Sequence, residues 1–113
     1  MYLSYSQRKE AQQNREELGA EITRLCGYLY AAQYRLLTLI REFDEADGWQ
    51  EEGLYSCAHW LNWQCGIGMN AAREKVRVAH CLAELPKISA TLEKGEISYS
   101  KVRAMTRVAT TEN

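Results

Sequence analysis

One spacing pattern in the first half of this 113-residue chain constrains its fold more than any other feature. Apolar side chains recur there at alternating steps of four and three residues, which places all of them on one face of an α-helix. A β-strand would scatter the same residues over both of its faces, because strand side chains alternate. The pattern predicts one long helix, roughly Lys9 to Ala46, whose apolar stripe is formed by Leu18, Ile22, Leu25, Leu29, Ala32, Leu36, Leu39 and Phe43.

A second apolar row lies beside this stripe and widens it beyond the narrow seam of a coiled coil. The row consists of Cys26, Tyr30, Leu37 and Ile40. One face of the helix can then pack on the rest of the chain while the other pairs with a second copy, or the chain's own helices can occupy both faces. Spacing alone does not decide between these arrangements. The residues predicted for a self-association face are Leu18, Ile22, Leu25, Leu29, Leu36 and Phe43.

The remainder of the chain is typical of about four shorter helices that pack against the stripe. Asp47-Gly48 predicts a helix stop with the glycine in a left-handed conformation, and Ser56 predicts an N-cap. The second helix then covers residues 57–65 and ends at Gly66, and Asn70 is a candidate cap for the third. We expect Ala72, Val76, Ala79 and Ala83 to form the buried stripe of that third helix.

The last third of the chain predicts two more helices. Pro86 suits the first turn of a helix, where no N–H bond is needed, and Gly95 closes that helix. Ser98 is the predicted cap of a final helix. Its inward residues are expected to be Val102, Met105 and Ala109.

Length and composition fit one all-α domain. A chain of this length supports one core, and a single proline among 113 residues favours long helices. The predicted organisation is a long helix at 1–47, a linker at 48–55 and a helical bundle at 56–110. We expect no membrane segment and no signal peptide. The cysteines lie within apolar helical patterns, which favours reduced, buried thiols in a cytoplasmic protein over disulfides; they are Cys26, Cys57, Cys65 and Cys81.

Charge is distributed unevenly along the chain. Residues 1–56 carry six Lys/Arg and ten Asp/Glu, a net charge of −4, whereas residues 57–113 carry eight and five, a net charge of +3. A basic second half suggests an anionic partner, although a charge of this size is also common on solvated helices.

The second half resembles a known family. The features that carry the resemblance are Trp60-Leu61, Gly66, the segment AREKVRVA from Ala72, Leu85-Pro86 and GEISYSKVRAMTRVAT from Gly95. In order and spacing they are similar to the bacterial DUF222 domain, also called the 13E12 repeat family. That domain commonly forms the N-terminal part of proteins that end in an HNH endonuclease module.

The resemblance does not bring nuclease activity to this chain. In the family, histidines of the HNH module bind a divalent metal and activate water. This chain ends at Asn113 and contains only His59 and His80, neither in an HNH-like setting. The resemblance therefore implies a non-catalytic accessory domain rather than an enzyme.

A basic face on the third and fifth helices is the strongest candidate site. Arg73, Arg77 and His80 are spaced to share one surface, and Arg103 and Arg107 pair one turn apart. Two basic helices, the first after a tight turn, suit a helix-turn-helix entering a major groove. The predicted DNA-binding residues are Arg73, Lys75, Arg77, His80, Lys101, Arg103 and Arg107. The alternative is a solvated surface neutralised by Glu74, Glu84, Glu93 and Glu96.

Other chemistry is less well supported. The potential zinc ligands Cys57, His59, Cys65, His80 and Cys81 match no zinc-finger or zinc-ribbon spacing. Trp60 and Trp63 are expected to anchor their short helix to the long one rather than to stack on bases. We therefore expect no cofactor, no metal and no small-molecule ligand, and DNA or a second copy of the chain as the partner.

Overall fold

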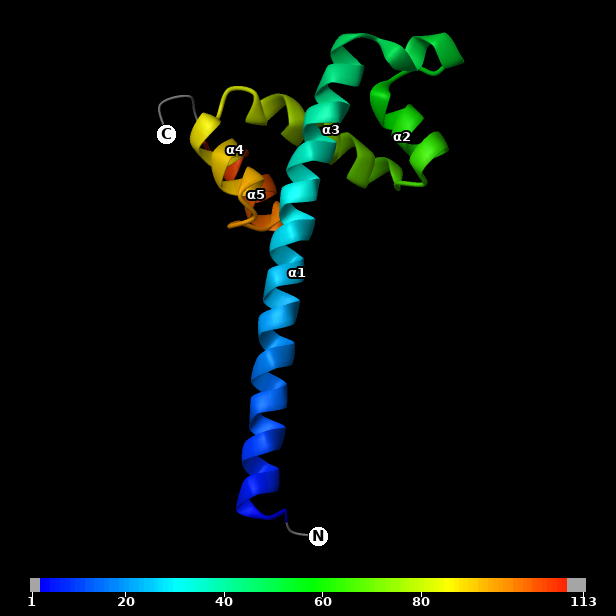
Figure 1. Cartoon of the computed structure of the whole chain (residues 1–113). Coiled ribbons are helices and arrows are strands. Elements are labelled where there is room, and N and C mark those ends of the chain that lie inside the picture. Colours follow the sequence, from blue (N-terminus) through cyan, green and yellow to red (C-terminus); the bar gives the residue numbers. More distant parts are fainter. Residues whose placement is uncertain (1–2, 110–113) are drawn as a thin grey trace.

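The fold is built on a single long helix that carries the shorter helical segments near its C-terminal end (Figure 1). The computed structural model describes residues 3–109. In chain order the elements are α1 (Tyr5–Glu45), the 3-10 helix η1 (Gly48–Glu52), α2 (Cys57–Cys65), α3 (Met69–Leu82), α4 (Pro86–Glu93) and α5 (Tyr99–Met105). The predicted all-α architecture, with one long N-terminal helix and shorter partners, is confirmed.

The long helix begins four residues earlier than its apolar pattern predicts because a capping box defines its start. The Ser4 hydroxyl accepts a hydrogen bond from the backbone N–H of Gln7 at 3.2 Å. The Gln7 side chain accepts one from the backbone N–H of Ser4 at 2.9 Å. These reciprocal bonds satisfy donors that a helix start otherwise leaves free.

The stop after α1 uses a different residue from the predicted one. Asp47, not Gly48, takes the left-handed conformation, with φ of 53°, which aspartate tolerates better than most residues. Gly48 is needed for another reason, since a Cβ there would overlap the ring of Phe43. The local sequence therefore stops the helix as expected, but by another geometry.

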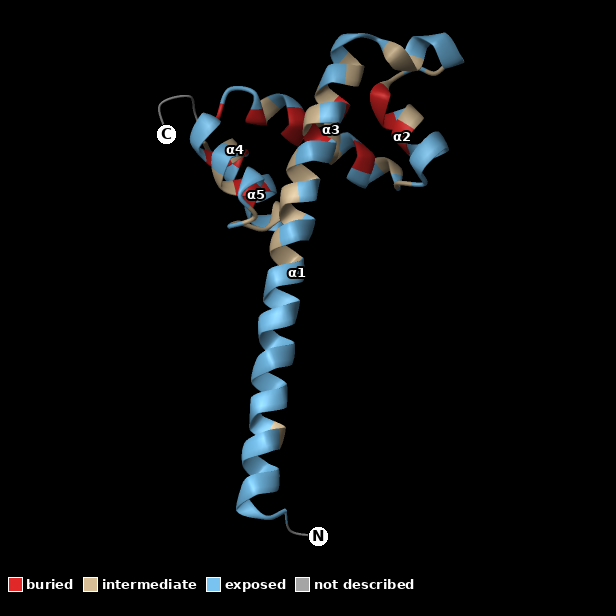
Figure 2. Ribbon diagram, in the orientation of Figure 1, coloured by how far each residue is buried: buried red, intermediate tan, exposed pale blue. Residues whose placement is uncertain are grey.

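We divide the molecule into an arm, residues 5–25 of α1, and a head, residues 26–109. Every residue of the arm is exposed except Ala11, which is half-buried (Figure 2). The core lies wholly in the head, and α1 contributes only Leu37 and Ile40 to it. The other core residues come from the shorter segments: Cys57, Ala58, Leu61, Ala72, Val78, Ala79, Leu82, Leu85, Ile88, Leu92 and Val102.

The predicted packing of the shorter helices against the apolar stripe is wrong. They cover the neighbouring row that contains Leu37 and Ile40, and the stripe stays open. A close approach explains this choice of side, because the turn after α4 crosses α1 where Gly95 meets the backbone of Gly27. The exposed stripe residues are Leu18, Ile22, Leu25, Leu29, Ala32, Leu36 and Leu39, and Phe43 is half-buried.

Helix α3 is buried on more sides than its sequence suggests, because it contacts α1, α2, α4 and α5. Ala72 and Ala79 are buried as predicted, together with Val78 and Leu82, which the prediction left outside the buried stripe. Val76 is only half-buried, and Ala83 is exposed.

The ends of the short helices largely follow the sequence signals. Ser56 and Ser98 cap α2 and α5. Gly66 ends α2 with φ of 69°, and Pro86 occupies the first turn of α4. The predicted cap of α3 is wrong, because Gly68 occupies the cap position two residues earlier and Asn70 lies inside the helix.

Two side chains predicted to be inward, Met105 and Trp63, are exposed. Val102 of α5 is buried as predicted, and the second buried residue of this region is Thr106, which follows α5 as its C-cap. Trp60 packs on Phe43 of α1 with ring centroids 4.4 Å apart, whereas Trp63 is 60% exposed. The buried hydroxyl of Thr106 is hydrogen-bonded to Arg77 and to the carbonyl oxygen of Arg103.

The four cysteines are free. Cys57 is buried, and burial raises the pKa of its thiol to about 11. Cys26 and Cys81 are half-buried, but Cys65 is exposed, contrary to prediction. None of the described helices combines the length and the apolar character needed to cross a bilayer.

Candidate nucleic-acid interface

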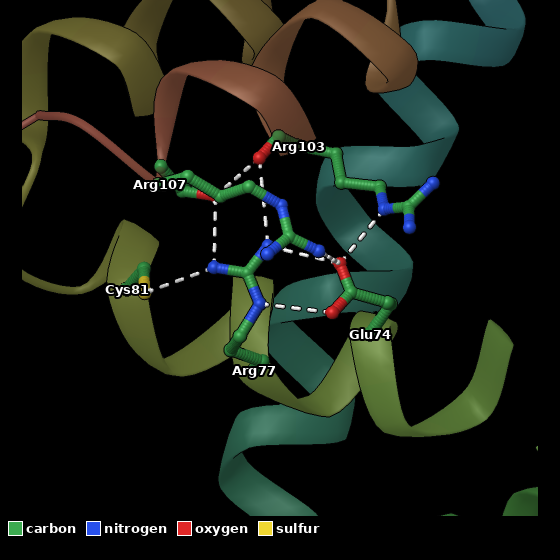
Figure 3. A network of polar contacts seen from close by, with 6 residues as sticks. Glu74, Arg77, Cys81, Arg103 and Arg107 are labelled. Carbon is green, nitrogen blue, oxygen red and sulfur yellow. Dashed lines mark hydrogen bonds and ion pairs between the residues drawn. The ribbon is translucent and has the colours of Figure 1, made fainter. Parts of the chain in front are cut away.

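Three arginines, from α3, from α5 and from the turn that follows α5, converge on one carboxylate, that of Glu74 (Figure 3). Arg77, one turn later on α3, forms a forked pair with it through Nε at 3.1 Å and Nη2 at 3.0 Å. Arg103 of α5 donates from Nε at 2.7 Å, and Arg107 donates from Nη2 at 3.0 Å. Helices α3 and α5 are therefore joined through Glu74.

Arg77 is the most internal of the three arginines. Its Nη1 donates to the Thr106 hydroxyl at 3.3 Å, and its Nη2 lies 3.4 Å from the carbonyl oxygen of Arg103. The Thr106 hydroxyl in turn donates to that same carbonyl at 2.8 Å. A weaker contact joins Arg77 to the sulfur of Cys81 at 3.9 Å. Arg77 thus holds the end of α5 in place and has few donors left for an external ligand.

Arg103 and Arg107 remain accessible. Their side chains are 48% and 54% exposed, against 32% for Arg77. Each uses one nitrogen on Glu74 and donates no other side-chain hydrogen bond within the described residues. A guanidinium group carries five N–H donors, so both arginines can bind an anion without leaving the carboxylate.

The Glu74 carboxylate is strongly stabilised in its charged form. Hydrogen bonds from Arg77 and Arg103, assisted by the charges of Arg77 and Arg107, lower its pKa to about 2. It therefore stays negative at neutral pH and balances one of three arginine charges. The cluster of Glu74, Arg77, Arg103 and Arg107 carries a net charge of +2.

Lys75 lies beside this cluster and against an aromatic ring. Its ammonium nitrogen is 4.3 Å from the ring centroid of Tyr99, within the range of a cation–π contact. Burial, together with the charge of Arg103, lowers the pKa of Lys75. Burial raises the pKa of Tyr99, whose buried hydroxyl has no hydrogen-bond partner among residues 3–109.

His80 belongs to a separate contact. Its Nε2 lies 2.7 Å from Oδ2 of Asp44 on α1, and Oδ1 of the same carboxylate accepts a bond from the indole of Trp49 at 3.0 Å. Asp44 is thus only partly exposed. This arrangement ties α3 and η1 to the end of α1 and keeps His80 apart from the arginine cluster.

The structure therefore sorts the predicted basic residues into three groups. Arg77, Arg103 and Arg107 meet at Glu74, with Lys75 beside them. Arg73 and Lys101 are exposed and make no ion pair within the described part of the chain. His80 pairs with Asp44 instead.

The central role of Glu74 is only partly readable in the sequence. Its spacing of three from Arg77 predicts a helical pair, and the alternative of neutralisation by glutamates holds for this residue. Glu84, Glu93 and Glu96 form no ion pair among the described residues. The contacts with Arg103 and Arg107 join residues 29 and 33 positions apart, and Tyr99 and Thr106 enter the site by the same long-range packing.

No group of three or more His, Cys, Asp or Glu residues within 3–109 is placed to hold a metal ion. The remaining histidine, His59, bonds locally, with its Nδ1 2.7 Å from the Ser56 hydroxyl.

The described helices define an all-α domain with a basic cluster between α3 and α5. A model of the family described as "Domain of unknown function (DUF222)" matches residues 8–111, and the chain belongs to this family. No curated protein and no solved structure matches the chain.

Proposed function

We propose that this domain is a non-catalytic accessory module that associates with DNA through the basic face of α3 and α5. The observation that carries the proposal is the convergence of three arginines on one glutamate, which leaves an excess of positive charge on ordered side chains. Ordered arginines lose less conformational freedom on binding phosphate than free ones, since their geometry is already fixed. Lys75, Arg73 and Lys101 add further positive charge on the same two helices.

The residues of this face divide into two roles. Arg77 is a positioning residue, because its donors are directed to Glu74, Thr106 and the α5 backbone. Arg103 and Arg107 are the expected phosphate contacts, together with Lys101, two residues before Arg103, and Arg73, which precedes Glu74 on α3. Contacts of this kind set affinity and orientation on a duplex and carry no base specificity.

The helix order also supports this proposal. Helices α2 and α3 follow each other through the short turn at Gly66–Gly68, as in a helix-turn-helix pair. The face includes α5 as well as α3, however, so the proposed contact is a surface of two helices rather than one recognition helix.

The accessory, non-catalytic part of the proposal comes from the family resemblance, in which an HNH module elsewhere in the protein performs the chemistry. The two histidines of this chain contact Ser56 and Asp44, respectively. We therefore assign the domain a role in holding DNA, not in cleaving it.

Fluorescence anisotropy with a labelled random-sequence duplex, read at several salt concentrations, tests the proposal. With four phosphate contacts, log Kd should rise with log salt at a slope of about 3 to 4. The Arg103→Glu/Arg107→Glu variant should lose binding at every salt concentration. The matched control, Lys87→Glu/Lys94→Glu on and beside α4, makes the same charge change outside the cluster and should retain most of the affinity.

Two results would contradict the proposal. One is a folded wild-type chain that does not bind duplex at low salt. The other is an equal loss of affinity in both double variants, which would mean that total charge and not the α3/α5 face is responsible. Either result would leave the long helix as the functional surface of the domain.

A further inference from the structure

A second surface, distinct from the basic face, lies along α1. Most of its apolar stripe is left uncovered by the described part of the chain: Leu18, Ile22, Leu25 and Leu29 are 58–64% exposed, and Leu36 and Leu39 are 38% and 43% exposed. A monomeric protein rarely presents a continuous row of large aliphatic side chains to water. A stable interface buries roughly 800 Å² on each partner, and this row of partly exposed leucine and isoleucine side chains supplies apolar surface for such an interface.

We propose that the occupant of this stripe is a second copy of the chain, paired through α1 in antiparallel orientation. The stripe residues lie at positions 18, 22, 25, 29, 32, 36, 39 and 43, so the spacing between them is the same in both directions along the helix. Reversing one helix about a point between residues 30 and 31 places every apolar residue opposite another. The resulting layers pair Leu18 with Phe43, Ile22 with Leu39, Leu25 with Leu36, and Leu29 with Ala32 of the second copy.

Charge decides the orientation. The same alternation of three- and four-residue steps continues from Leu18 toward the N-terminus at Arg15, Ala11 and Arg8. In a parallel pair, Arg15 would face its own copy across the seam, as would Arg8, and the acidic C-terminal ends of both helices would lie together. In the antiparallel pair, Arg15 lies level with Ala46 of the second copy, next to Glu45 and Asp47.

Arg41 is the one arginine or lysine that pairs with that acidic end in the described part of the chain. The last turn of α1 contains no basic residue, although positive charge is favoured at a helix C-terminus. The Glu45 side chain is 61% exposed, and its only ion pair within the described residues is a long one of 3.8 Å to Arg41. Arg15 from a second copy supplies the missing charge, and the two helix dipoles then oppose each other.

The head also provides space beside the stripe where the arm of the second copy would lie. An apolar groove of about 510 Å³ between α1 and α2 is lined by Leu36, Leu39, Phe43, Trp60 and Cys65, among others. It flanks the part of α1 that the antiparallel layers assign to Leu18 and Ile22 of the second copy. A second groove of about 460 Å³ lies on the α5 side, where Leu36 and Tyr99 contribute to its wall.

Sedimentation equilibrium of the chain, from low to high micromolar concentration, tests the pairing. We expect a reversible dimer, and Ile22→Glu should raise its Kd by about 100-fold or more, because each dimer loses two buried isoleucines and gains two buried charges. The control is Thr23→Glu, which places the same charge one residue away, off the stripe. Far-UV circular dichroism verifies that both variants keep their helix content.

Cysteine cross-linking with a short bismaleimide tests the orientation, in a background carrying Cys26→Ser and Cys65→Ser. The double variant Ile22→Cys/Leu39→Cys should form covalent dimers, and neither single variant should. The two positions are about 26 Å apart along one helix, so they cannot be bridged within a chain. Cross-linking of Ile22→Cys alone would establish a parallel pair and overturn the proposal, as would a wild-type chain that stays monomeric throughout the concentration range.

Discussion

Residues 26–45 of α1 lie in the head, where Leu37 and Ile40 are almost completely buried, whereas residues 5–25 extend away from it with nearly every side chain in water. The same period of apolar residues runs through both parts. In the head, helix formation is stabilised by the burial of apolar side chains against α3 and α4.

In the arm, stability comes only from local interactions. These include the capping box at Ser4, amide–carboxylate bonds between Gln12 and Glu16 and between Gln13 and Glu17, and the exposed pair of Glu21 and Arg24. Side-chain pairs of this kind contribute about 0.2–0.5 kcal/mol each. The comparison shows that an apolar period forms a helix but does not determine which side of that helix is covered.

The largest expected difference is in the free energy of unfolding of two alanine variants, each replacing one leucine of α1. Leu37→Ala should destabilise the protein by about 2–5 kcal/mol, because it leaves a cavity in the core. Leu25→Ala, in the arm, should change the free energy of unfolding by less than about 0.5 kcal/mol when measured in dilute solution, where the chain is monomeric. Urea denaturation followed by circular dichroism measures both. Similar losses would mean that the arm is packed against the head.

A difference of intermediate size tests how tightly the head packs against its side of α1. Gly95 and Gly53 both have positive φ, 74° and 73°, but only a Cβ at Gly95 would overlap the backbone of Gly27. Gly53→Ala should cost about 1–2 kcal/mol, the strain of a left-handed residue. Gly95→Ala should cost a further 1–3 kcal/mol or so, the range typical of overpacking. Urea midpoints that shift equally would show that the crossing with α1 is not tight.

The smallest effect compares two Glu–Arg pairs of identical spacing. The folded-state pKa of Glu74 is about 2, below its ordinary value of 4.5. Its contribution to stability is therefore complete above about pH 4.5 and is lost as the pH falls toward 2. Glu74→Gln should flatten the fall of the urea midpoint across this range. Glu21→Gln, at the exposed arm pair, should leave the pH profile unchanged, and a flattening of equal size there would contradict the account.

Much of this fold is predictable because its signals are local. The period of the stripe specifies α1, and single residues such as Ser56, Gly66, Pro86 and Ser98 mark the ends of the short helices. Conversely, the choice between the stripe and the row of Leu37 and Ile40 depends on where later segments cross α1. Gly95 lies against the backbone of Gly27 on the covered side, and no local pattern encodes that contact.

The candidate site shows the same division. Arginine-rich spacing on α3 and α5 predicts a basic face, and the structure brings Arg77, Arg103 and Arg107 together. The spacing gives no sign that His80 turns to Asp44, 36 residues earlier in the chain. It also gives no sign that Arg77 is occupied by Thr106, because both contacts depend on how the helices pack.

Hydrogen–deuterium exchange of the intact chain at two concentrations tests the central claim most directly, namely that the arm is an open surface completed by a second copy. We expect amides of residues 15–25 to exchange rapidly in dilute solution and to become protected at high concentration. Amides in the buried helices of the head should be slow in both. Arm amides that show the same protection at both concentrations would contradict the account.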